Sequence, residues 1–168
     1  LKYPNSGDFL SPFAFGDWDG DGQDDAAVLY AADSTGTNVW LAVLEAETDG
    51  GWRVSQTVEG LSGEVEVFSA AHLRDSVSQQ LIAGYTSAQG DSYLVVYRYA
   101  DGQLTTVISQ SYTHMILADF TGKGDTQDLV LALPPDSELG GVTLQLLTAN
   151  DGEFRSTQTL NLGEGVYS

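Results

Sequence analysis

Aspartates crowd into one short stretch near the start of this chain, and their spacing suits a metal ion. Carboxylates at positions 1, 3, 5 and 9 of a tight loop repel one another unless a cation lies between them. Ca²⁺ takes roughly six to eight oxygen ligands in flexible geometry, whereas Mg²⁺ demands a stricter octahedron. The stretch is Asp17-Trp18-Asp19-Gly20-Asp21-Gly22-Gln23-Asp24-Asp25. We therefore predict one calcium site, with the side chains of Asp17, Asp19, Asp21 and Asp25 and the backbone carbonyl of Gln23 as ligands.

The residues around the ligands indicate which kind of calcium loop this is. Gly22, at position 6, permits the sharp bend that turns the carbonyl of position 7 inward. A helix–loop–helix calcium site would need a glutamate at position 12, which is Val28 here. The flanks, residues 13–15 and 26–30, are short apolar runs typical of buried strands. The loop is therefore predicted to join two strands, the alternative being an ordinary solvated turn rich in Asp and Gly.

Asp-Gly turns reveal an internal repeat. They fall at residues 49–50, 101–102 and 151–152, spaced 52 and 50 residues apart, and each lies between apolar-rich segments. Residues 52–58 and 154–160 then share the pattern aromatic, Arg, any residue, hydroxyl, Gln, Thr, aliphatic, and residues 104–110 form a looser copy. A period near 50 is typical of propellers and solenoids. The other expected strands are 13–15, 67–71 and 115–118, then 26–30, 81–85 and 129–133, then 39–44, 93–99 and 142–147.

The predicted fold is all-β and β-propeller-type, with three four-stranded antiparallel blades. The blades would cover residues of about 10–60, 64–112 and 113–162, within a single domain of residues 1–168. Inner strands that are apolar on both faces favour packed blades over a β-sandwich. Closed propellers have about four to eight blades. Three blades thus predict a partial propeller or an open arc, completed by further blades in a longer parent chain or by oligomerisation.

The order strand, Phe15-Gly16, D-x-D-x-D-G-x-x-D, strand resembles the FG-GAP or VCBS-type repeat of integrin-like β-propellers. The resemblance implies blades that are stabilised by Ca²⁺. It also implies an extracellular or cell-surface location, in a bacterium. Such repeats bind protein or glycan ligands, and they also occur as accessory propellers of larger secreted enzymes, including carbohydrate-active ones, or as structural spacers.

The equivalent loops in the other two units have lost ligands, and we expect neither to hold calcium. In the second loop the ligand positions carry His72, Arg74, Ser76 and Gln80, so a guanidinium replaces a carboxylate. In the third loop Lys123 either lies among Asp119, Asp125 and Asp128 or points into solvent. The sequence leaves open which of the two holds, and with it whether a second ion binds weakly there.

Composition narrows the function further. The chain has 168 residues, a net charge of −18 and no cysteine. The negative charge excludes nucleic acid and anionic membrane surfaces as partners, and no stretch is long and apolar enough for membrane insertion. His72 and His114 occupy no metal or catalytic spacing, and Glu64 and Glu66 fit solvated acids better than a glycosidase pair. We therefore expect a non-catalytic module.

The three tryptophans are expected to differ in exposure. Trp18, between two ligands, is expected to point away from the metal and to be an exposed contact. Trp40 and Trp52 lie on predicted strands, where core packing is the default.

Overall fold

The computed structural model describes residues 12–32, 34, 38–73, 76, 78–120, 122, 126–134, 142–150 and 153–161. Their regular secondary structure consists of β-strands. Within these ranges there are twelve strands and no helix. The described residues accordingly contain no helix with the length and apolar character needed to cross a membrane. The predicted all-β class is confirmed.

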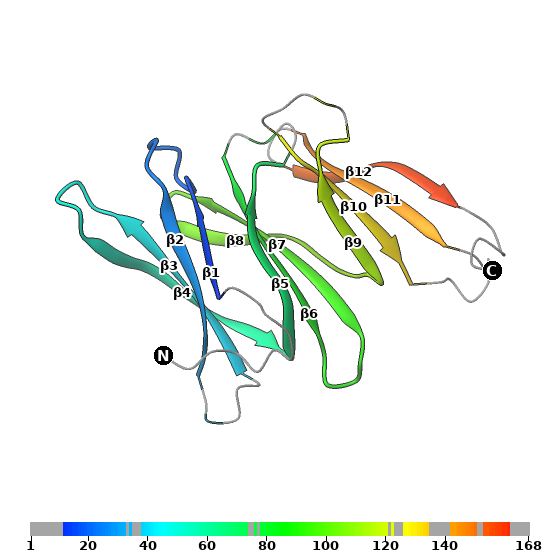
Figure 1. Ribbon diagram of the computed structural model, residues 1–168, viewed down its shortest axis with the longest axis horizontal. Coiled ribbons are helices and arrows are strands. Elements are labelled where there is room, and N and C mark those ends of the chain that lie inside the picture. Colours follow the sequence, from blue (N-terminus) through cyan, green and yellow to red (C-terminus); the bar gives the residue numbers. More distant parts are fainter. Residues whose placement is uncertain are drawn as a thin grey trace.

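As predicted, the strands form three four-stranded antiparallel sheets, and within each sheet the neighbouring strands are also neighbours in sequence. Sheet 1 contains β1 (Phe13–Gly16), β2 (Asp25–Ala31), β3 (Asn38–Ala46) and β4 (Trp52–Ser62). Sheet 2 contains β5 (Glu64–Ala71), β6 (Gln80–Thr86), β7 (Ser92–Ala100) and β8 (Gln103–Ser111). Sheet 3 contains β9 (His114–Ala118), β10 (Asp128–Leu133), β11 (Thr143–Asn150) and β12 (Glu153–Asn161). The sheets follow one another across the molecule (Figure 1), and the described strands do not close into a barrel or a propeller.

The hairpins form where the Asp-Gly pairs predict them. Gly50 and Gly102 adopt φ of 85° and 73°, in the turns that join β3 to β4 and β7 to β8. Backbone of this handedness favours glycine, because a side chain there would clash with its own main chain. The third pair, Asp151-Gly152, lies outside the described residues, although β11 and β12 on either side of it do pair.

Two apolar layers hold the sheets together. The first lies between sheets 1 and 2 and includes Trp18, Leu41 and Tyr97; the second lies between sheets 2 and 3 and includes Ile82, Val96 and Leu129. Sheet 2 is therefore packed on both faces, which explains why Leu81, Ile82 and Ala83 in β6 are consecutive apolar residues and all buried. Sheets 1 and 3 each turn one face away from the stack.

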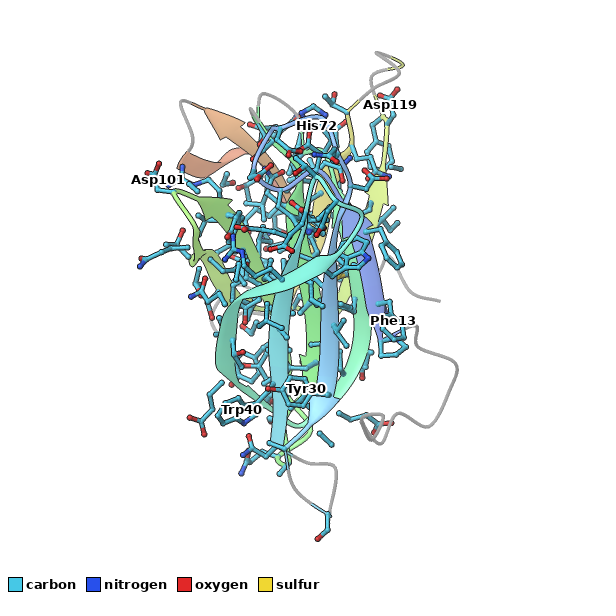
Figure 2. All side chains as sticks on the ribbon, turned by 90° about the vertical axis from the view of Figure 1, so that its left-hand side faces the viewer. Phe13, Tyr30, Trp40, His72, Asp101 and Asp119 are labelled. Carbon is cyan, nitrogen blue, oxygen red and sulfur yellow. The ribbon has the colours of Figure 1, made fainter. Side chains whose placement is uncertain are left out.

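The prediction that Trp52 packs in the core is wrong. Trp52 is 49% exposed instead of buried in the core, because it lies on the face of sheet 1 that turns away from sheet 2. Trp40, on the same face, is half-buried and packs against Tyr30 with ring centroids 6.3 Å apart. Figure 2 views this face, with Tyr30 and Trp40 near one end of the sheet and Phe13 along its side.

Tyr97 gives the layer between sheets 1 and 2 a pH dependence. Burial raises the pKa of this tyrosine to about 12 from 10.0, and the nearby Tyr85 adds to the increase. Because the folded pKa exceeds the unfolded one, the contribution of Tyr97 to the stability should be fully present below pH 10 and should be lost as the pH rises from 10 to 12. The expected loss is about 2–3 kcal/mol. Urea unfolding across this range should show a shallower decline for Tyr97→Phe than for wild type; parallel declines would contradict the assignment.

Candidate metal-binding loop

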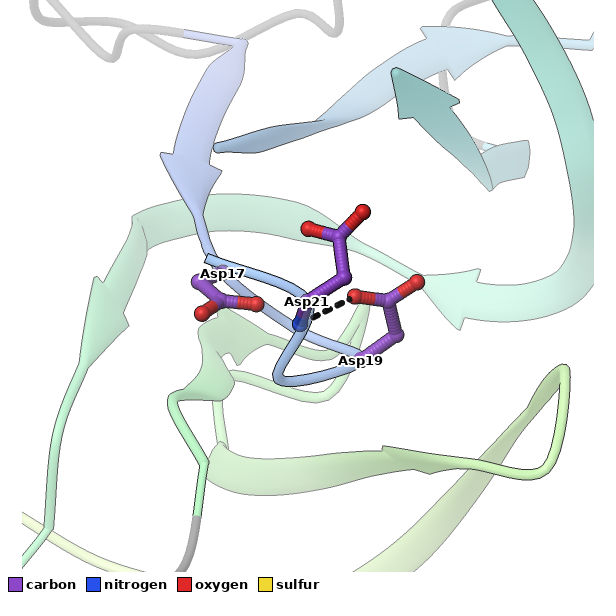
Figure 3. Close-up of side chains that lie close together, drawn as sticks. All are labelled: Asp17, Asp19 and Asp21. Atoms are coloured by element: carbon purple, nitrogen blue, oxygen red, sulfur yellow. Dashed lines mark hydrogen bonds between the residues drawn. The ribbon is translucent and has the colours of Figure 1, made fainter. Parts of the chain in front are cut away.

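The loop that joins β1 to β2 brings three of the predicted ligands together. Asp17, Asp19 and Asp21 each offer a carboxylate oxygen, and these oxygens lie within 4.8 Å of one another (Figure 3). Asp19 and Asp21 are exposed, and Asp17 is half-buried. The chain bends tightly at Gly20 and Gly22, on either side of Asp21, with φ of 81° and 88°.

Backbone N–H groups orient these carboxylates. Asp17 accepts hydrogen bonds from the N–H of Gly20 at 2.7 Å and of Gly22 at 3.1 Å. Asp19 accepts from the N–H of Asp21 at 3.0 Å. Asp21 accepts from Gln23 twice, through its backbone N–H at 2.7 Å and its side-chain amide at 2.9 Å. These donors reduce the repulsion between the acids, and a divalent cation would neutralise more of it.

Asp25 occupies the base of the loop rather than the cluster of three. It is 2% exposed, and it accepts hydrogen bonds from the backbone N–H of Ala46 at 3.0 Å and of Trp18 at 3.4 Å. Burial raises the pKa of Asp25, the charges of Asp19 and Asp21 raise it further, and the two hydrogen bonds lower it. The charged form of this carboxylate is thus costly in the loop alone, and a nearby cation would favour it.

The loops that join β1 to β2, β5 to β6 and β9 to β10 share one hydrogen bond that the sequence did not predict. The N–H of the second loop residue donates to the side chain of the last: Trp18 to Asp25 at 3.4 Å, Leu73 to Gln80 at 3.1 Å, and Phe120 to Asp128 at 3.2 Å. The three acceptors are at most 2% exposed. The signal in the sequence is the last loop residue, ninth in the first two loops and tenth in the third, which is Asp25, Gln80 and Asp128 and so always offers a side-chain oxygen.

In the second loop the side-chain amide of Gln80 both accepts and donates hydrogen bonds, so it binds groups on two sides of the loop. The Gln80 Nε2 donates to the hydroxyl of Ser76 and to the carbonyl of Ser78, while its Oε1 accepts from Leu73. His72 also belongs to this loop, since its Nε2 lies 3.0 Å from the Ser76 carbonyl. Arg74, which the sequence singled out, lies outside the described residues.

The third loop begins like the first. Asp119 accepts a hydrogen bond from the N–H of Gly122 at 2.7 Å, as Asp17 does from Gly20. Gly122 has a φ of 67°. Thr121, Lys123 and Asp125 lie outside the described residues, so neither of the two alternatives for Lys123 is tested. His72 and Asp119 lie at the same end of the sheets (Figure 2) and line one polar cavity with Gln79 and Gln127.

The prediction that Trp18, the second residue of the first loop, is exposed is wrong. Trp18 is 1% exposed and packs in the layer between sheets 1 and 2. It does point away from the acids, but into the neighbouring sheet instead of solvent. Leu73 is likewise buried, between sheets 2 and 3. Phe120, the third equivalent, is 58% exposed.

The sequence matches no protein-family model and no curated protein. What the chain does must therefore be inferred from its loops and sheets.

Proposed function

We propose that this chain is a calcium-binding, non-catalytic β-repeat module that presents its surface to a protein or glycan outside the cell. The observation that carries the proposal is the convergence of Asp17, Asp19 and Asp21, with oxygens within 4.8 Å of one another. The ligands would be all oxygen, which is the donor type that Ca²⁺ prefers.

Each ligand would have a distinct part in holding the ion. Asp17, which is half-buried, and the exposed Asp19 and Asp21 would supply carboxylate oxygens. Asp25 would approach from the buried base, where the charge of the ion would offset the cost of its burial. The backbone carbonyl of Gln23 would complete the protein ligands, and water would fill the remaining positions.

At the level of the fold, we propose an arc of three propeller blades of the FG-GAP or VCBS type. Two features support this interpretation: the sheets stack in sequential order, and the loops share the hydrogen bond from their second to their last residue. An exposed calcium loop suits extracellular fluid, where modules bind with dissociation constants of roughly 10⁻⁴–10⁻³ M. We place the protein outside the cell or on a bacterial cell surface on this ground.

Calorimetric titration of the chelator-treated protein with CaCl₂ tests the proposal. One Ca²⁺ should bind per chain. Asp21→Ala should weaken binding about tenfold or more, because it removes a charged ligand. Asp24→Ala is the matched control, since Asp24 has the same charge at a position without ligand function, and its affinity should stay near that of wild type. No binding, or equal losses in the two variants, would refute the proposed site. A stoichiometry of two or three would contradict the interpretation of the other loops.

A further inference from the structure

The face of sheet 3 that turns away from sheet 2 is apolar, and no described residue covers it. A groove of about 200 Å³ lies there, lined by Phe120, Val130, Leu144, Leu146, Gln158 and Leu160. Phe120 and Leu160 are 58% and 52% exposed, and Ile116 beside Val130 is 57% exposed. Apolar groups gathered in this way on an open face mark an interaction surface.

The same face is covered in the other two sheets. The pair Val130–Leu146 between β10 and β11 corresponds to Ala27–Val43 in sheet 1 and to Ile82–Val96 in sheet 2. Those four residues are fully buried, beneath sheet 2 and sheet 3 respectively. Among the described residues this junction thus occurs twice, and no sheet covers the third instance.

The surface that would complete the third junction is present at the other end of the stack. On the open face of sheet 1, Phe13, Phe15, Trp52 and Val54 are 40–58% exposed. Phe13 pairs with Val28 as Phe68 pairs with Ala83 in sheet 2, and Phe68 is buried against sheet 1. Sheet 1 therefore carries on its open face the residue pattern that sheet 2 uses to cover sheet 1.

One polar contact of the first junction has matching residues on the two open faces. At the first junction the side-chain oxygen of Gln56, in β4, accepts a hydrogen bond from the backbone N–H of Leu104, in β8. Gln158 has the place of Gln56 in sheet 3 and is exposed in the groove. Trp52 has the place of Leu104 in sheet 1, since each pairs near the end of its hairpin, with Ala46 and Tyr99 respectively.

We infer that a second copy of this chain covers the groove, with its sheet 1 packed on sheet 3 of the first. The chain carries both halves of the junction, so two copies related by a twofold axis can form it twice and close into a ring. This head-to-tail pairing does not depend on calcium, because the loop acids take no part in it. The net charge of −18 on each chain opposes the pairing, so added salt should strengthen it.

Sedimentation velocity from roughly 1 to 100 µM protein tests the inference. Wild type should form a species of twice the 17.9 kDa of one chain. Phe120→Glu and Phe15→Glu each place a charge at one side of the junction, on residues that are 58% exposed and so need not disturb folding. Each variant should be monomeric. Thr159→Glu is the matched control, because it adds the same charge to β12 on an exposed residue next to Leu160, and it should still dimerise.

Mixing the two monomeric variants tests whether sheet 1 of one copy pairs with sheet 3 of the other. Phe120→Glu retains an intact sheet 1 face and Phe15→Glu an intact sheet 3 face, so an equimolar mixture should form a dimer through one junction, weaker than wild type. A monomeric wild type at all concentrations would overturn the inference. So would one variant that dimerises alone, which would mean that a face binds its own kind. Calcium titration of the same variants should still give one ion per chain, which separates this test from that of the metal site.

Discussion

Replacing Trp18 with alanine should lower the free energy of unfolding by about 3–5 kcal/mol, the usual cost of truncating a large buried aromatic residue. Trp18 is 1% exposed and is one of the largest fully buried side chains among the described residues. It belongs to the layer between sheets 1 and 2, so its loss would leave a cavity that the flanking strands can close only in part. Urea unfolding monitored by circular dichroism would measure the change.

Phe120→Ala is the natural comparison, because Phe120 occupies the same position in the third loop. It is 58% exposed, so its truncation should cost about 0.5 kcal/mol or less in a monomer. The comparison is best made in the Phe15→Glu background, where the proposed pairing of chains cannot contribute. Trp18→Phe should fall between the two, since it keeps an aromatic ring in the layer. Equal costs for Trp18→Ala and Phe120→Ala would contradict the assigned packing.

Withdrawing calcium should be the second large perturbation. A ligand that binds only the folded state stabilises it by about 2.7 kcal/mol at a hundredfold excess over its dissociation constant. Chelation would remove this contribution and leave Asp17, Asp19 and Asp21 to repel one another, within 4.8 Å. Scanning calorimetry should therefore show a melting temperature several degrees lower in chelator than in millimolar CaCl₂.

Two controls make the calcium result specific. Asp21→Ala should melt at nearly the same temperature with and without calcium, because it lacks a ligand, whereas Asp24→Ala should respond as wild type does. MgCl₂ at the same concentration should stabilise less, since Mg²⁺ keeps its waters and demands stricter geometry. A wild-type melting temperature that calcium does not change would argue against the site.

The sequence by itself determined the features that depend on neighbouring residues. Apolar runs such as 26–30 and 129–133 predicted strands that the structure contains, and the Asp-Gly pairs at 49–50 and 101–102 predicted turns, because hairpin geometry is decided within a few residues. The spacing of Asp17, Asp19 and Asp21 likewise predicted a cluster that does form. Each of these outcomes needs only local backbone geometry.

Only the tertiary structure decided what lies against each sheet. Trp18, Leu73 and Phe120 hold the same place in their repeats, yet the first two are buried and the third is exposed, because a sheet follows the first two loops and none of the described sheets follows the third. For the same reason Trp52 lies on an open face. Asp25 lies beneath its loop, where it accepts a hydrogen bond from the N–H of Ala46 at the end of the neighbouring strand β3. A repeat pattern specifies which face of a strand is apolar. Whether that face is covered depends on where the next sheet lies.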